Sequence, residues 1–444
     1  MHPHVPPRRL LLLALPLAPL ALPAPALAAD FDSGSTAWVL VSSALVLFMM
    51  IPGLALFYGG LVRTKNVLSV LMQCMALTAV ITVLWFAFGY SLAFDTAGMQ
   101  AGAVNLHSFV GTFGKSFLAG IGPETASGAI PEAAFFVFQL TFAVITPGLI
   151  VGAFAERMKF SAMLAFSALW LLFVYVPICH MTWGGPGGLF ANWGVFDFAG
   201  GIVVHLTAGV AALVACLEVG PRHGYGKTPM LPHNMTMCFI GTGMLWVGWF
   251  GFNGGSALAA DGNAALAVTA TQISGATAAA TWMVIEWIRR KPSVLGIATG
   301  AIAGLAAVTP ASGFVGPFGA FAIGLASGTC CYFAATTLKQ RLGYDDSLDV
   351  FGVHGVGGFL GTVLAAVFAA PAFGGKGDPA SYSIASQFGT QLLACVIAAA
   401  YTATVSFGLL RVVSALLGGL RVDVESETRG LDLSQHDESG YNPS

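Results

Sequence analysis

Two histidines, His205 and His354, are the residues of this sequence whose type and setting could do chemistry. Each follows a valine in a long, apolar, glycine-rich stretch. An ionisable side chain at bilayer depth is costly, and it usually faces a cavity or a partner. A neutral imidazole has one N–H donor and one acceptor nitrogen, so two facing rings could share a proton or present a polar edge. The pair predicts a pathway for a small hydrogen-bonding solute; the alternative is that each ring satisfies a helix contact.

The composition indicates what kind of protein must position these histidines. Of 444 residues, 56% are hydrophobic and 9% are charged, which excludes a water-soluble globule and indicates an all-α polytopic membrane protein. The net charge of -2, without a basic domain, gives no reason to expect a nucleic-acid partner. All seven cysteines lie in apolar segments without a C-x-x-C pair, so we interpret them as packing residues. We expect neither a metal nor a cofactor.

Residues 1–29 have the order of a secretory signal peptide. Arg8 and Arg9 precede an apolar run, and small residues follow at positions 24–29. An uncleaved anchor is the alternative, but the apolar core is short and contains prolines. We therefore expect a mature N-terminus outside the membrane, a transmembrane domain over 30–420 and a cytoplasmic tail over 421–444.

Eleven later segments are long and apolar enough to span a bilayer as helices. An odd number places the C-terminus on the side opposite the exported N-terminus. The predicted spans are 36–61, 67–94, 131–155, 160–183, 197–219, 235–259, 265–288, 294–310, 317–338, 350–371 and 385–418.

Basic residues in the loops give an independent orientation. The loops after spans 1, 3, 5, 7 and 9 carry eleven lysines and arginines, whereas the opposite loops carry only Lys115 and Lys376. Since basic loops stay in the cytoplasm, the N-terminus is predicted outside and the C-terminus inside.

A weak internal repeat places the two histidines at equivalent positions in the sequence. Around both His205 and His354, a valine precedes, a glycine follows four residues later and a valine nine residues later. The run Phe57–Gly60 is echoed by Phe252–Gly255, which pairs span 1 with span 6 and span 5 with span 10. Five helices per unit turn the second unit upside down. We expect two inverted five-helix repeats plus a C-terminal helix, with both histidines near the midplane at the repeat interface.

The cost of dehydration suggests which solute could pass. A cation entering a dry pore pays tens of kcal/mol by Born reasoning, whereas a neutral amine pays far less. A cation that sheds its proton could be captured at the mouth by aromatic faces, worth roughly 0.5–2 kcal/mol each, with a hydroxyl beside them. The outer span ends offer Phe138, Phe142, Trp183, Phe252 and Ser256, although packing or lipid contact is the ordinary use of membrane aromatics.

Four long motifs resemble the ammonium transporter (Amt) family of the Amt/Rh superfamily. They are 51–63, 197–205, 248–253 and 349–355, and the resemblance covers essentially the whole chain after the signal peptide. It implies eleven helices in two inverted halves, an outside N-terminus and a homotrimer with one pore in each subunit. The run Gly184–Gly188 after Trp183 is longer than the family's pattern and puts the local geometry there in doubt.

The resemblance also implies a role for individual residues. It assigns ammonium recruitment to Phe142, Trp183 and Ser256, a phenyl gate to Phe142 and Phe252, the pore to His205 and His354, and support to Asp197 and Phe138.

The expected function is that of a permease and not of an enzyme. It would bind ammonium outside the bacterial inner membrane, deprotonate it and conduct ammonia past the histidines. The resemblance implies a PII-type signalling protein as cytoplasmic partner. Alternatives are an ammonium sensor that signals through such a partner, an Rh-type gas channel, and a redox protein that uses both histidines as haem ligands.

Overall fold

A computed structural model describes residues 30–441 of the chain, and the predicted signal peptide lies outside that range. All eleven predicted spans are helical. The segments are Ser33–Leu61 (α1, η1, α2), Thr64–Phe94 (η2, α3, η3, α4), Glu132–Phe154 (α5), Phe160–Trp183 (α6, η6, α7), Gly201–Val219 (η7, α9), Met235–Gly255 (α10), Gly262–Arg289 (α11), Val294–Val308 (α12), Pro317–Leu342 (α13, η8, α14), Phe351–Phe368 (η9, α15) and Ile384–Leu416 (α16).

Within the described range, nine of these segments are long and apolar enough to cross a membrane. The other two are α11 and the shorter α12, so the polytopic all-α class is confirmed while the count of eleven spans stays a prediction. The remaining elements are short and lie outside the spans. They are η4 (Leu106–Ser108), η5 (Ser116–Leu118), β1 (Ala126–Ser127), β2 (Ile130–Pro131), α8 (Leu189–Asn192), η10 (Pro371–Phe373), α17 (Val424–Arg429) and α18 (Leu431–His436).

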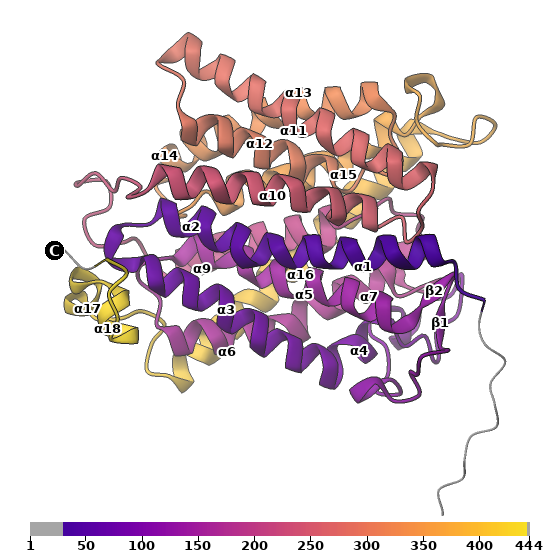
Figure 1. Ribbon diagram of the computed structural model, residues 1–444, viewed down its shortest axis with the longest axis horizontal. Coiled ribbons are helices and arrows are strands. Elements are labelled where there is room, and N and C mark those ends of the chain that lie inside the picture. The colour runs from indigo at the N-terminus through magenta and orange to yellow at the C-terminus, as the bar shows by residue number, and fades with distance from the viewer. Residues whose placement is uncertain (1–29, 442–444) are drawn as a thin grey trace, which may run out of the picture.

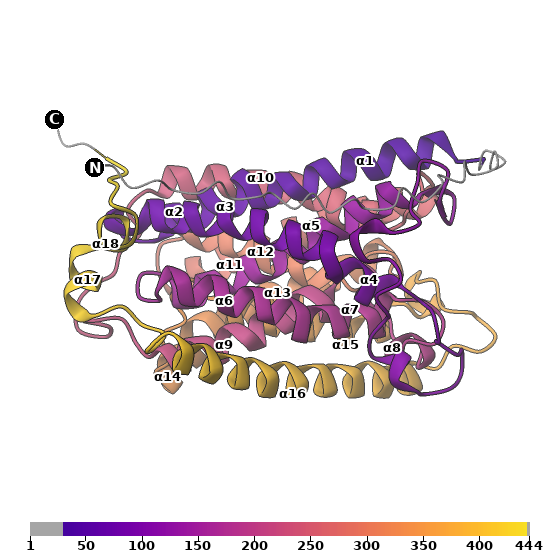
Figure 2. The same cartoon turned by 90° about the horizontal axis from the view of Figure 1, so that it is seen from below.

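The helices run along one common axis, so the bundle has two ends (Figure 1). We call the end with the β1–β2 hairpin the hairpin end and the end with α17 and α18 the tail end. Helix α16 runs along the outside of the bundle between them (Figure 2). Helices α11, α12 and α13 pack tightly because Gly304 and Gly324 both face the backbone of Ser274. Small residues thus allow close helix packing there.

The predicted and observed span boundaries differ by at most four residues. One of the largest differences is at the span that carries His205, which begins at Gly201 and not at 197. Gly200 has a φ of +117°, a conformation that favours glycine and ends regular helix on its N-terminal side. Residues 197–200 therefore form a cap before the helix.

Both histidines lie in π-helical turns. His205 belongs to η7 (Gly201–Leu206) and His354 to η9 (Phe351–Gly355), each at the start of its span. A π-turn widens the helix by one residue and is frequent at functional sites. The two turns contact each other across the repeat interface.

The tail forms part of the folded body at its end of the bundle. The Asp432 carboxylate accepts a hydrogen bond from Ser69 N in the first turn of α3, at 2.7 Å. In return, Asn66 Oδ1 accepts one from Leu431 N at the start of α18, at 2.8 Å. Each helix thus supplies an acceptor for an N–H group that the other leaves unpaired.

Candidate functional site

The two histidine rings face each other. Their Nδ1 atoms are 3.2 Å apart, and their ring centroids lie 5.2 Å apart with planes inclined by 17°. Both side chains are buried, and His205 Nε2 has no hydrogen-bond partner within residues 30–441. In a hydrogen bond between the two Nδ1 atoms, one neutral ring donates its N–H and the other accepts. The remaining ring edges, with their Nε2 atoms, face the surroundings as polar groups.

These edges border a small cavity, which we call the central cavity. Its volume is about 10 Å³, close to what a single water needs. Apart from the two histidines its walls are apolar or aromatic: Met49, Leu54, Phe57, Ile145, Leu149, Val204, Leu245, Trp249, Phe252 and Ile302. The space therefore suits one small molecule that can exchange a hydrogen bond with imidazole.

The glycines of the internal repeat bring the two histidine helices together. A Cβ at Gly209 would overlap the backbone of Gly355 beside His354. A Cβ at Gly358 would lie 2.8 Å from the Cβ of His205. The glycine four residues after each histidine thus leaves room for the opposite histidine's turn.

Asp197 fixes the start of the His205 helix. Its Oδ1 accepts hydrogen bonds from Gly200 N and Gly201 N, and its Oδ2 from Ile202 N and Val203 N, at 2.6–3.1 Å. Burial raises the pKa of Asp197 to about 6, although these four donors act in the opposite direction. The carboxylate therefore holds the turn that carries His205.

Asp346 occupies the equivalent place before His354, and our sequence analysis missed it. Both aspartates precede their histidine by eight residues, an offset that could have revealed the second one. Asp346 Oδ2 accepts from Phe351 N at 2.8 Å, while Oδ1 is buried without a partner among the described residues. Burial raises its pKa to about 6 as well. The repeat thus supplies both histidine turns with a buried aspartate.

A second cavity of about 270 Å³ opens on the hairpin end, and we call it the hairpin-end cavity. Phe138, Phe142, Trp183 and Ser256 all line it. The rings of Phe142 and Trp183 are 5.8 Å apart and nearly perpendicular. Ser256 Oγ donates to Phe252 O at 2.8 Å, so the lone pairs of its hydroxyl oxygen can still accept a hydrogen bond.

Five other residues of this cavity were not anticipated from sequence: Ser127, Phe135, Gln139, Phe198 and Leu258. Gln139 is the most informative because its buried Oε1 has no partner in the part of the chain that the structure describes. A glutamine inside an apolar helix is a signal that could have marked it.

Two phenylalanine rings separate this cavity from the central one. Phe142 lines the hairpin-end cavity and Phe252 lines the central cavity. Their centroids are 4.3 Å apart with planes inclined by 41°, and Phe252 lies 6.0 Å from the ring of His205. Both rings are almost completely buried, so they leave no open passage.

The run Gly184–Gly188 forms a tight loop beside Trp183. Gly185 and Gly187 have φ values of +125° and +119°, which a residue with a Cβ rarely adopts. Trp183 itself is held by its Nε1, which donates to Asp197 O at 2.8 Å. The longer run therefore leaves Trp183 at the cavity wall.

A third cavity of about 140 Å³, the tail-end cavity, reaches His354 from the other side. Its wall includes Tyr58, Leu61, Arg222 and Asp349, and it shares Phe57, Ile302 and His354 with the central cavity. The three cavities thus follow one another along the bundle, with the histidine pair in the middle.

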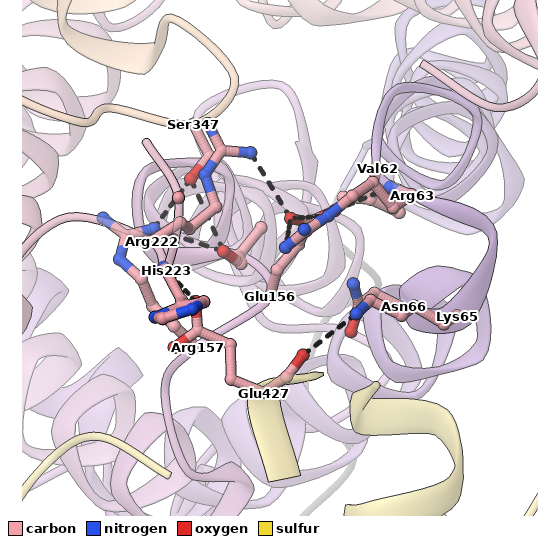
Figure 3. A network of polar contacts seen from close by, with 12 residues as sticks. Val62, Arg63, Lys65, Asn66, Glu156, Arg157, Arg222, His223, Ser347 and Glu427 are labelled. Carbon is pink, nitrogen blue, oxygen red and sulfur yellow. Dashed lines mark hydrogen bonds and ion pairs between the residues drawn. The ribbon is translucent and has the colours of Figure 1, made fainter. Parts of the chain in front are cut away.

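A network of buried ions fixes the loops around the tail-end cavity (Figure 3). Arg222 donates to both carboxylate oxygens of Asp345, at 2.9 and 2.7 Å, and lies 3.4 Å from Glu156. Glu156 also accepts from Arg63 Nε at 2.8 Å. Burial opposes the charge of Glu156, but Arg222 and Arg63 outweigh it and lower the pKa of that carboxyl. The network joins the first repeat, through Arg222, to the second, through Asp345.

All seven cysteines are free, and six of them are buried; Cys330 is exposed. The predicted packing role agrees with the burial of those six.

Comparison with known proteins gives one consistent result. Residues 37–441 match the model of the Ammonium Transporter Family. An ammonium transporter of Aquifex aeolicus is 44% identical over 420 residues, covering 93% of this chain and 95% of that protein. One of Bacillus subtilis is 43% identical over 405 residues, covering 90% and 97%.

Solved structures agree with these relatives. The Mep2 crystal structure from Saccharomyces cerevisiae aligns with a TM-score of 0.79 and 36% identity, over 89% of this chain and 90% of that one. A structure named Sensor Amt Protein aligns with a TM-score of 0.82 and 28% identity, over 91% and 98%. This chain belongs to the ammonium transporter family.

Proposed function

We propose that the chain is an ammonium permease that captures ammonium in the hairpin-end cavity, removes a proton and conducts ammonia past His205 and His354. The observation that supports this most is the series of three cavities. An aromatic cavity with a hydroxyl oxygen leads to a closed phenylalanine pair and then to a space of about 10 Å³ beside two imidazoles. Membership of the family agrees with transport and gives no reason to expect an enzyme.

The residues divide the work by their chemistry. Phe142 and Trp183 offer π faces to a cation, and Ser256 can accept a hydrogen bond from it. Beyond Phe252 the wall is apolar or aromatic apart from the two imidazoles. A cation would lose most of its hydration there without compensation, whereas ammonia would pay far less. Phe138 and Asp197 support this arrangement. The ring centroid of Phe138 lies 4.9 Å from that of Phe142, and the backbone oxygen of Asp197 accepts the hydrogen bond from Trp183 Nε1.

We further propose the setting in which this permease works. The tail end faces the cytoplasm of a bacterial inner membrane, the N-terminus lies outside after cleavage near residue 29, and the division into 30–420 and 421–444 separates membrane domain from tail. The protein works as a homotrimer, and a PII-type protein docks at the tail end. The basic loops on that side support the orientation.

Uptake of methylammonium into vesicles tests the division of labour. For Trp183→Ala we expect half-saturation to rise by about 2- to 30-fold, which corresponds to one lost cation–π contact. For His354→Ala we expect changed maximal flux with half-saturation kept. Trp287→Ala is the matched control, because Trp287 is 68% exposed on the outside of α11. Unchanged flux in both site variants would contradict the assignments.

An ammonium sensor acting through a PII-type partner is the second candidate, and the likeness to Sensor Amt Protein is the observation that favours it. Binding of the partner that responds to ammonium while vesicle uptake stays at the level of empty vesicles would select this function over the permease.

A further inference from the structure

Gln391 is a buried glutamine on α16, the C-terminal helix that follows the two repeats. This helix runs along the outside of the bundle (Figure 2), yet the side chain of Gln391 is completely buried. A polar side chain inside a membrane protein is costly unless its donors and acceptors are paired. The partners of Gln391 therefore indicate what this residue does.

The amide of Gln391 binds both backbone groups of Phe196, in the loop before the His205 helix. Its Oε1 accepts from Phe196 N at 2.7 Å, and its Nε2 donates to Phe196 O at 2.7 Å. The same Nε2 donates to Thr362 O on α15 at 3.0 Å. A side-chain amide has two N–H donors, and both are used here. Gln391 thus ties α16 to one loop residue and to α15.

Phe196 has few other means of staying in place. Among residues 30–441, Gln391 is the only hydrogen-bond partner of its backbone N–H and C=O. Its ring stacks on that of Phe314, with centroids 4.5 Å apart and planes inclined by 19°. Stacking fixes the side chain, whereas the position of the peptide groups depends on Gln391.

The residues after Phe196 build the hairpin-end cavity. Asp197 O accepts from Trp183 Nε1, and the Asp197 carboxylate accepts from four N–H groups around the start of η7. Phe198 lines the cavity directly. Because the peptide bond that joins Phe196 to Asp197 is planar and stiff, a shift of the first residue moves the second. Gln391 thereby reaches Trp183 through two consecutive residues.

The tail end holds the equivalent residue by charge instead. Asp345 stands directly before the buried aspartate of the second repeat, as Phe196 does in the first. Its carbonyl oxygen accepts from Arg157 Nη2 at 2.6 Å. A guanidinium at the hairpin end would repel a cation in the cavity, whereas the neutral amide of Gln391 does not. The two ends thus solve one positioning task with groups that suit their different linings.

We propose that Gln391 is a positioning residue of the hairpin-end cavity: through Phe196 and Asp197 it holds Trp183 in the wall where a cation is captured. No residue of α16, which is described in full, lines any of the three cavities, so Gln391 acts without touching the solute. The identity of the cation rests on the proposed function, whereas the placement of Trp183 does not.

Uptake of methylammonium into vesicles tests the effect on capture. Gln391→Met keeps the length of the side chain and removes its three hydrogen bonds. We expect half-saturation to rise at least about threefold, and by no more than in Trp183→Ala, which loses the whole cation–π contact. Gln387→Met is the matched control one turn earlier on α16. It loses bonds to Gly194 O and Gln391 Oε1 but leaves Phe196 held, so we expect a change below about twofold.

A double variant separates positioning from general damage to the fold. If Gln391 acts through Trp183, adding Gln391→Met to Trp183→Ala should change half-saturation by less than about twofold, because the residue being positioned is already gone. Effects that multiply in the double variant overturn the proposal, as does an unchanged half-saturation in Gln391→Met alone.

Fluorine NMR follows Trp183 without any ammonium flux. The chain is labelled with 5-fluorotryptophan, and Trp183→Phe identifies the resonance by its loss. We expect that resonance to shift or broaden in Gln391→Met and to stay in place in Gln387→Met. An unmoved resonance in Gln391→Met overturns the proposal. A parent chain without uptake refutes the permease instead and leaves Gln391 to be judged by this spectrum.

A second substitution covers the case in which Gln391→Met does not fold. In its neutral form the carboxyl of Gln391→Glu keeps an acceptor for Phe196 N and one O–H donor. We therefore expect its half-saturation to lie between those of the parent and Trp183→Ala, with a smaller effect than that of Gln391→Met where both fold. A half-saturation and a fluorine spectrum identical to those of the parent in Gln391→Glu, when it is the only folded variant, overturn the proposal.

Discussion

The two ends of the pore have the same scaffold and different linings. At each end a buried aspartate lies eight residues before a histidine, and a phenylalanine, Phe252 or Phe57, lines the central cavity. Four residues after the phenylalanine, however, the hairpin end has Ser256 and the tail end has Leu61, and each lines its own cavity. An inverted repeat thus preserves the backbone that positions the histidines, while substitutions in the lining give the pore a direction.

Charge is distributed just as unequally. The hairpin-end cavity is lined by aromatic, apolar and uncharged polar side chains, whereas Arg222 and Asp349 line the tail-end cavity. A cation can be bound at the first end by π faces and a hydroxyl. At the second end each of these charges already has a partner elsewhere, Arg222 with Asp345 and Glu156, and Asp349 with Lys339. They therefore hold loops together and leave little net attraction for a solute.

The ion network at the tail end should therefore show the largest effect on stability. Arg222→Met leaves Asp345 and Glu156 buried without their shared cation, and we expect a loss of about 3–5 kcal/mol in the free energy of unfolding. Arg411→Met is the control, because its pair with Glu218 is exposed, and we expect less than ~1 kcal/mol. Denaturant unfolding in detergent measures both, and equal losses would remove the distinction.

The same network predicts a pH dependence with a definite sign. The pKa of Glu156 and that of Asp345 are lowered in the folded chain, for Asp345 because its hydrogen bonds to Arg222 outweigh the opposing effect of burial. Their stabilisation is present above the unfolded values near pH 4 and is lost as the pH falls through the folded ones. The difference between the parent and Arg222→Met should therefore shrink in acid.

The two aspartates should respond differently to the same substitution. Asp197→Asn replaces one of two accepting oxygens by a donor and leaves two N–H groups without acceptors, at about 1–3 kcal/mol each. Asp346→Asn can place its amide where Oδ1 already lacks a partner, so we expect less than ~1 kcal/mol. Thermal unfolding measures the loss of stability in both variants. A larger loss for Asp346→Asn than for Asp197→Asn would contradict the expected difference between the two aspartates.

The sequence predicts the scaffold better than the linings for a physical reason. Span positions follow from hydropathy, and the glycine four residues after each histidine already indicates that the two turns approach closely. The pairing of the loop ions Arg222 and Asp345 depends instead on a contact between residues far apart in the chain, and no period or offset marks it. Gln139 is marked only by its residue type in an apolar helix, which does not tell that it lines a cavity. Asp346 lies between these cases. Its offset of eight residues from His354 matches that of Asp197 from His205, but the motif that resembles the family begins three residues later, at Asp349, and so leaves Asp346 out.

The smallest predicted effect concerns the position at which the two linings differ most. In Ser256→Ala the cavity loses one acceptor for a bound cation, and we expect half-saturation for methylammonium to rise by roughly tenfold or less, or about 1.4 kcal/mol. The hydroxyl's bond to Phe252 O is also lost, so Ser256→Cys serves as a control that keeps a weak donor there.

The reciprocal substitution sharpens this prediction. Leu61→Ser gives the tail-end cavity a hydroxyl at the position that Ser256 occupies in the other repeat. Arg222 lines the same cavity. We expect half-saturation from the hairpin side to stay unchanged, because Phe57, the histidine pair and Phe252 lie between the new hydroxyl and the hairpin-end cavity. A shift as large as that of Ser256→Ala would mean that the two ends communicate and that the repeat, not the lining, sets the affinity.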